Sequence, residues 1–169
     1  MLLGLYYITK GRRIASDQIV RGEGKAFYSN EEVIIAYNEG VIDMHAWIKV
    51  KVNIRNSDGL LEHKLIETTV GRVIFNQHVP AEVGFVNALL TKKNLREIIG
   101  DIINITNVPK TAKFLDDIKT LGFRTAFQGG LSFSINDLII PDVKEELLAN
   151  AKLEVDEVWE SYNMGLITN

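Results

Sequence analysis

The sequence contains no cysteine. Disulfides, thiolate zinc sites and cysteine nucleophiles are therefore excluded, and the redox compartment stays undetermined, although a cytosolic origin is compatible. Histidine is scarce too, and the residues present are scattered without metal-ligand spacing: His45, His63 and His78. No metal site is predicted from these residues.

Long apolar runs are missing as well. The run Met1–Tyr7 is apolar from its first residue but far too short to span a bilayer. It has neither a charged n-region nor a small-residue cleavage site, so it is not a signal peptide. The run is predicted to be a buried strand or helix end, and no membrane is predicted as a partner.

Recognisable catalytic patterns are also absent. No serine lies in a nucleophile elbow, and no histidine pairs with an acid at a known spacing. Asp116 and Asp117 are adjacent, and neighbours on a helix point about 100° apart, so the two carboxylates cannot jointly hold a metal. Gly22–Lys25 resembles a fragment of a phosphate loop but lacks the full spacing. No catalytic residue is predicted.

The overall composition is that of an ordinary globular protein. With 169 residues, 46% of them hydrophobic, the chain can bury a core as one domain with an appendage. The net charge of -3 is uneven, because residues 100–169 carry 11 acidic and 6 basic side chains. Attraction of the whole protein to nucleic acid is therefore not supported. Any such contact would be local, around Lys10, Arg12 and Arg13 or along one strand face.

Alternation marks one strand, Met44–Arg55, in which apolar and polar residues take turns. Leu60–Thr69 returns after the turn residues Asn56–Gly59, which predicts a β-hairpin. Lys49 and Lys51 on the outer face fit either phosphate contacts or a solvated strand protected by lysines. Two further β-prone runs are Thr69–Asn76 and the alternating residues Leu131, Phe133 and Ile135.

Capping residues and apolar spacing predict four helices, and with the hairpin they give an α+β fold. Their expected bounds and caps are Ser29 to Asn38 closed by Gly40, Lys92–Asn104, Lys110–Leu121 closed by Gly122, and a long final helix capped by Asp142. The inward residues of the middle two are expected to be Leu95, Ile98, Ile99, Ile102, Ile103, Phe114, Leu115 and Ile118. The sheet should be a small antiparallel hairpin, and the last helix should protrude.

The final helix carries an apolar row at alternating steps of three and four. Its members, called the seam below, are Leu148, Ala151, Val155, Val158 and Tyr162. Such spacing is typical of a coiled-coil seam that packs on a second helix. Gly165 breaks the pattern, so we expect half of a helical hairpin excised from a longer natural chain. The helix is also acidic, which fits either a solvated face or an arm that docks basic proteins.

Six short segments occur in an order and spacing that resemble one protein family. They are Met1–Tyr7, His45–Val52, Thr68–Arg72, Gly122–Phe123, Ile135–Asp137 and Ile140–Pro141. The family is the bacterial DNA-directed RNA polymerase β′ subunit, and the resemblance covers essentially the whole chain. It implies a fragment that lines the secondary channel and serves transcription in the cytoplasm. The implied divisions are a strand-rich pore segment, 1–88, a helical funnel segment, 89–141, and the first rim helix with its tip, 142–169.

The family's catalytic metals are held by an Asn-Ala-Asp-Phe-Asp-Gly-Asp motif that is absent here. The resemblance therefore implies that Mg²⁺ is bound upstream in the intact nucleotidyltransferase, and that this fragment has no cofactor and no activity alone. The implied partners are the β and α subunits, with ω left open, and DNA and RNA only in the assembled enzyme.

The last helix matches the first of two rim helices, where Gre-type transcript-cleavage factors and DksA-like regulators dock in this family. The implied contact residues are Asp156, Glu157 and Glu160 on the helix and Met164, Gly165, Leu166, Ile167 and Thr168 at its tip. A free-standing interaction protein that dimerises through the seam is the alternative. A native stop codon after Asn169 would favour it.

In some family members the helix matching Lys110–Leu121 helps to bind the alarmone ppGpp beside ω, through a lysine, an aspartate and an aromatic residue. Asp116 falls on the aspartate position. Thr120 stands at the aromatic position and Pro109 at the lysine position, with Lys110 one place away. Only Asp116 is therefore carried over as a candidate for this site.

Overall fold

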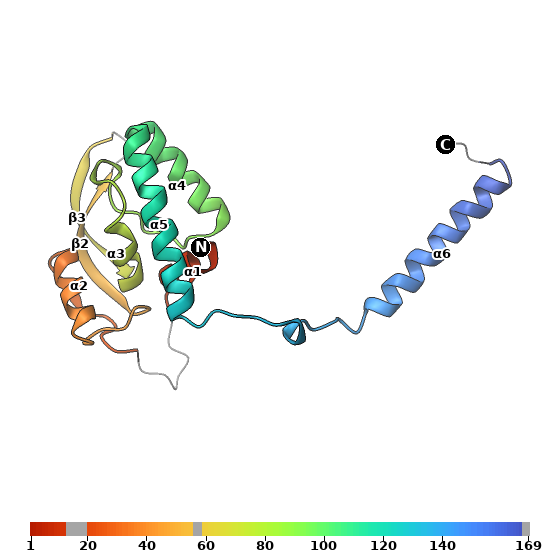
Figure 1. The fold of residues 1–169 in the computed structure, drawn as a ribbon, viewed down its shortest axis with the longest axis horizontal. Helices are drawn as coiled ribbons and strands as arrows, with labels where there is room; N and C mark the ends of the chain where they lie inside the picture. The colour runs from red at the N-terminus through yellow and green to blue at the C-terminus, as the bar shows by residue number, and fades with distance from the viewer. Residues whose placement is uncertain (13–19, 56–58, 167–169) are drawn as a thin grey trace. The chain divides into compact units, whose positions relative to one another are not determined.

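The computed structural model describes residues 1–12, 20–55 and 59–166 (Figure 1). The chain divides into two compact units, Met1–Leu131 and Ser132–Asn169. The first unit combines a sheet with helices, and the second contains a short turn and one long helix. The predicted α+β class is therefore confirmed.

The sheet of the first unit has three strands in the order β1-β2-β3. Strands β2 (Trp47–Arg55) and β3 (Leu61–Thr69) pair antiparallel, from Trp47 opposite Thr69 to Arg55 opposite Leu61. The hairpin is thus confirmed, although residues 56–58 of its turn lie outside the described part. The sheet is not a hairpin alone, because the short strand β1 (Ala26–Phe27) adds a parallel edge to β2.

Six helical elements are found in the described residues of the first unit. They are α1 (Leu2–Thr9), α2 (Asn30–Asn38), α3 (Val70–Asn76), the 3-10 turn η1 (Ala81–Val83), α4 (Lys92–Ile105) and α5 (Val108–Gln128). Figure 1 shows the sheet along one side of this unit and helices α1, α4 and α5 along the other. Helix α1 packs on α5 and α3, and α2 packs on α3 and β2.

The core lies between these layers. Ile48, Val50 and Val52 of β2 are buried, as their alternation predicts, whereas Lys49 and Lys51 are exposed. From the helices, large side chains that are almost completely buried join them: Leu5, Ile8, Phe75, Phe114, Ile102 and Ile118. Ser29 accepts a hydrogen bond from the backbone N–H of Glu32 at the start of α2, and Gly40 closes that helix with φ +69°, both as predicted.

Two expectations about local structure in the first unit are wrong. Val70–Asn76, read as β-prone, is helix α3: the Thr69 hydroxyl caps it by accepting from the N–H of Arg72, and the helix is buried on several sides. Gly122, expected to end a helix at Leu121, lies inside α5, which continues to Gln128. A methyl group at Gly122 would come within 2.7 Å of the Met1 carbonyl oxygen, so this glycine permits a close helix approach instead.

Some predicted inward residues are also wrong. Ile103 of α4 and Leu115 of α5 are 52% and 39% exposed, whereas Leu95, Ile98, Phe114 and Ile118 are buried as predicted. The apolar stripe of each helix is therefore narrower than the sequence suggests.

The second unit contains the 3-10 turn η2 (Ile135–Asp137) and helix α6 (Lys144–Asn163). The expected strand at Leu131, Phe133 and Ile135 is wrong. Ser134 instead accepts from the N–H of Asn136, and the Asp137 carboxylate accepts from the N–H of Ser134, which closes a local turn. The cap of α6 also differs: the position preceding it is Val143, without a side-chain hydrogen bond, and not Asp142.

Candidate functional site

Helix α6 is the first candidate, because sequence reasoning placed the partner-binding residues there. It carries six carboxylates and two lysines, and none of its residues is buried. Asp156, Glu157 and Glu160 are exposed, and within the described part of the chain none of their three carboxylates has an ion-pair or hydrogen-bond partner. Their charges are therefore open to a basic surface.

The seam of α6 is exposed as well. The exposed fractions of Val155, Val158 and Tyr162 are 53%, 58% and 44%. Trp159, which the seam pattern does not include, packs edge-on against Tyr162 with ring centroids 5.9 Å apart. Together these residues present an apolar and aromatic surface beside the carboxylates, a combination typical of protein–protein contact regions.

The end of α6 is a compact turn. The N–H of Gly165 donates to the carbonyl of Tyr162, and the N–H of Leu166 donates to that of Ser161. Gly165 has φ +71°, the left-handed conformation that ends helices, so the predicted break at this residue is confirmed. Met164 and Leu166 are 66% and 73% exposed. Ile167 and Thr168 lie outside the described residues.

The second candidate is Asp116 on helix α5. Its carboxylate accepts a hydrogen bond from Lys119 at 2.8 Å, and its carbonyl accepts one from the Thr120 hydroxyl. The neighbouring Asp117 pairs instead with Lys113 at 2.7 Å, and this hydrogen bond lowers the pKa of the Asp117 carboxyl. The two adjacent carboxylates therefore take part in separate ion pairs on α5.

His78 and Glu82 lie beside the start of α5. His78 Nδ1 is 3.9 Å from the Asp117 carboxylate, yet the pKa of His78 is lowered because burial outweighs this attraction. Lys110 binds Glu82, and that contact lowers the pKa of the Glu82 carboxyl. Lys110 and Asp116 thus bind different partners, and the structure does not direct them at a common point.

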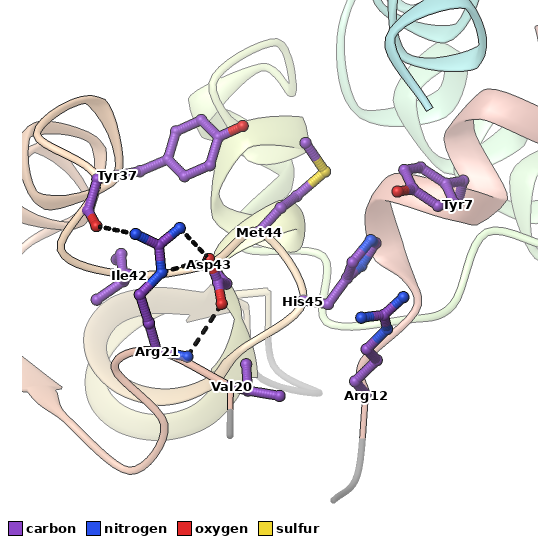
Figure 2. Close-up of a pocket in the computed structure, with 10 residues that line it drawn as sticks. Tyr7, Arg12, Val20, Arg21, Tyr37, Ile42, Asp43, Met44 and His45 are labelled. Atoms are coloured by element: carbon purple, nitrogen blue, oxygen red, sulfur yellow. Dashed lines mark hydrogen bonds and ion pairs between the residues drawn. The ribbon is translucent and has the colours of Figure 1, made fainter. Parts of the chain in front are cut away.

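A third candidate, a cavity of about 680 Å³ in the first unit, was missed by the sequence analysis (Figure 2). One side holds Arg21, whose guanidinium donates to the Asp43 carboxylate at 3.0 and 3.2 Å and to the Gly40 carbonyl. The other side holds Tyr7, Arg12 and His45. These residues come from three separate stretches of sequence, so no local motif could have revealed the cavity.

His45 links two of those stretches. Its Nδ1 donates to the carbonyl of Lys10 at 2.8 Å, and its own carbonyl accepts from the N–H of Arg12 at 3.1 Å. The edge of its ring meets Tyr7, with centroids 4.7 Å apart. Burial lowers the pKa of His45, and the nearby charges of Arg12 and Lys10 lower it further. The neutral ring therefore keeps Nε2 as a hydrogen-bond acceptor.

Neither a metal cluster nor a membrane-spanning helix is found in the described ranges. There, no three of the side chains of His, Asp and Glu gather closely enough to hold a metal ion. Likewise, none of the helices described is both long and apolar enough to cross a membrane.

Comparison with known proteins gives a consistent result. Residues 1–138 match the family model for RNA polymerase Rpb1, domain 3. The chain is also similar, over all 169 residues, to proteins named DNA-directed RNA polymerase subunit beta': 51% identical in Flavobacterium johnsoniae, 54% in Karelsulcia muelleri and 52% in Bacteroides fragilis. In each case the chain covers 12% of the relative's length.

Proposed function

Because the chain belongs to the family of bacterial RNA polymerase β′ subunits, we propose that it forms part of the wall of the secondary channel in a DNA-dependent RNA polymerase. The observation that carries this proposal is a sequence identity of 51 to 54% to β′ subunits along the entire chain. In this proposal residues 1–88 belong to the pore, 89–141 to the funnel and 142–169 to a rim arm. The comparisons give no support to a free-standing dimer.

The chemistry of RNA synthesis is assigned to other parts of the polymerase. The described residues include no cluster of three acidic or histidine side chains that could hold Mg²⁺. We expect Mg²⁺ to be bound elsewhere in the intact nucleotidyltransferase. The partners are then the β and α subunits, with DNA and RNA contacted in the assembled cytoplasmic enzyme.

The arm formed by α6 and its end is proposed to dock proteins that enter the channel, such as Gre-type or DksA-like factors. Its exposed carboxylates support this role, because they can attract a basic surface and orient it during encounter. The exposed seam supports a further packing partner, which we take to be a second helix of the complete β′ subunit.

The docking proposal is tested in the complete β′ subunit by replacing Asp156, Glu157 and Glu160 with alanine. We expect factor affinity at low salt to fall by about ten-fold or more, and the salt dependence of binding to become weaker. A matched control removes three carboxylates near the start of the same helix, at Asp142, Glu145 and Glu146. Unchanged affinity and salt dependence in the first variant would reject the acidic arm as the docking determinant.

Asp116 is proposed as the one residue of this chain that contacts the alarmone. A ligand there would meet an Asp116 carboxylate that already accepts from Lys119 through one oxygen, and a Lys110 that is paired with Glu82. Replacing Asp116 with asparagine in the assembled polymerase should weaken alarmone binding if the contact exists. Equal binding by the variant and the parent enzyme would remove Asp116 from the proposal.

A further inference from the structure

The two sides of the cavity in Figure 2 differ in charge: one holds a paired cation and anion, and the other holds a cation. Arg21 and Asp43 cancel each other's charge through two side-chain hydrogen bonds, and the Asp43 carboxylate also accepts from the N–H of Arg21 at 3.0 Å. Arg12, across the cavity, has no hydrogen-bond or ion-pair partner for its guanidinium among the residues described. Among the described residues, the cavity therefore contains one cation without a charge partner.

The backbone that carries Arg12 is held firmly. Its N–H donates to the carbonyl of His45, and the His45 ring returns a hydrogen bond to Lys10. Between them, Gly11 lies against the Trp47 indole so closely that a methyl group there would come within 2.5 Å of the ring nitrogen. The backbone of Arg12 is thus held by its neighbours, while its exposed guanidinium offers a planar fork of donors that suits an oxyanion.

The remaining walls define what else a ligand must offer. Tyr37, Ile42 and Met44 supply ring and aliphatic surface, and the neutral His45 presents Nε2 as an acceptor near Arg12. A volume of about 680 Å³ is much larger than a phosphate ion and falls within the range of pockets for small organic ligands. The ligand needs an anionic group, a hydrogen-bond donor and an apolar or ring-shaped body.

We propose that this cavity binds a small organic oxyanion, a molecule that carries a ring and either a phosphate monoester or a free carboxylate, whose anionic group pairs with Arg12 and whose hydroxyl or amine donates to His45. The site is built from residues of the first unit alone and does not depend on the proposed docking role. It lies between residues 10–12, which follow α1, and the turn before β2. Hydrogen bonds already join these two segments, and a bound ligand would add a further link between them.

The protonation state of His45 depends on the charges around this cavity. The positive charges of Arg12 and Lys10 help to lower its pKa, and Asp43 acts in the opposite direction. An anion on Arg12 would offset those positive charges, whereas the hydrogen bond that the ligand donates to Nε2 requires the neutral ring, whose Nδ1 already donates to the Lys10 carbonyl. The lowered pKa keeps the ring in this neutral form.

The test is a titration of the full 169-residue chain with adenosine monophosphate, followed by the NMR signals of the His45 ring and the Arg12 side chain. Adenosine and inorganic phosphate serve as separate arms, one without the anion and one without the ring. We expect adenosine monophosphate to shift both signals, inorganic phosphate to shift them at about ten-fold higher concentration, and adenosine to leave Arg12 unmoved. No shift with either anion would overturn the proposal.

Variants separate this site from general charge attraction. Arg12→Met should reduce the affinity for adenosine monophosphate by about ten-fold or more. Lys93→Met, which removes the same charge from an exposed position on α4, should change it by less than about two-fold. Equal losses in the two variants, or none in Arg12→Met, would show that the cavity does not select the anion through Arg12.

Discussion

Gly71 determines how closely helix α3 approaches helix α1. A methyl group on it would overlap the carbonyl oxygen of Ile8, which is backbone and cannot rotate away. Gly71→Ala should therefore lower the free energy of unfolding by about 1–3 kcal/mol, as other overpacking substitutions do. Gly100→Ala is the matched control, because a methyl group there meets no atom within 4 Å. It should raise stability by about 0.5–1 kcal/mol. Urea unfolding measures the free energy of unfolding of both variants. Equal changes in the two would contradict the close approach of α3 to α1 as the cause.

His45 gives a pH dependence whose sign follows from its lowered pKa. The folded chain holds the proton less tightly than the unfolded chain, for which the pKa is near 6.5. The unfolded state therefore binds more protons below that value, so the contribution of His45 to stability is present above pH 6.5 and is lost as the pH falls.

Replacement of His45 by asparagine tests this prediction while keeping an N–H donor for the Lys10 carbonyl. Between about pH 7.5 and 5.5 the free energy of unfolding of the parent chain should fall more steeply than that of the variant. His63→Asn, on the exposed strand β3, controls for the loss of a histidine. A His45→Asn variant with the full slope of the parent would show that other groups cause the dependence.

Among the elements, the stability of helix α5 depends on the residue just before it. Asn107 precedes it and accepts a hydrogen bond from the N–H of Lys110 at 3.0 Å. Asn107→Ala should lower the free energy of unfolding by about 1 kcal/mol, whereas Asn107→Asp should retain most of it because aspartate caps equally well. Thermal unfolding followed by circular dichroism measures both. A similar loss in the two variants would indicate that the side chain acts through something other than the cap.

Sequence pattern predicted the elements whose signal is local. The alternation in β2 and the Ser29 cap of α2 were both recognised, because each depends on residues close together in the chain. Helix α3 was misread, since its β-branched residues and Phe75 favour a strand, while the Thr69 cap and burial on several sides favour the helix. Gly122 was misread for a related reason: its role is contact with α1, which lies more than a hundred positions earlier in the sequence.

At the scale of the whole molecule, a functional site can likewise be predicted from sequence only when its residues lie close together in the chain. The acidic arm was found from sequence because one helix contains it, and the structure adds that its carboxylates are exposed. The cavity was not found, because the hydrogen bonds between residues 10–12 and His45 exist only after folding. The tertiary arrangement, and not the residue pattern, brings Arg12 and His45 together.

The seam of α6 should behave differently in the chain alone and in a complete β′ subunit. Val155 and Val158 are more than half exposed here, so replacing both with serine should change the stability of the 169-residue chain by less than about 0.5 kcal/mol. If a second helix covers them in the complete subunit, each would contribute about 1.5–3 kcal/mol there, and the double variant should make the arm more sensitive to protease.

Leu153→Ser provides the control for that comparison, since Leu153 is 63% exposed on the same helix but lies outside the seam. It should leave the protease sensitivity of the arm unchanged in the assembled polymerase. The digestion rate of the arm is measured for the parent, the double variant and the control under identical conditions. If the double variant and the control are digested at the parent rate, no helix packs on the seam, and docking through the arm would then rest on its carboxylates and on the exposed turn at Gly165.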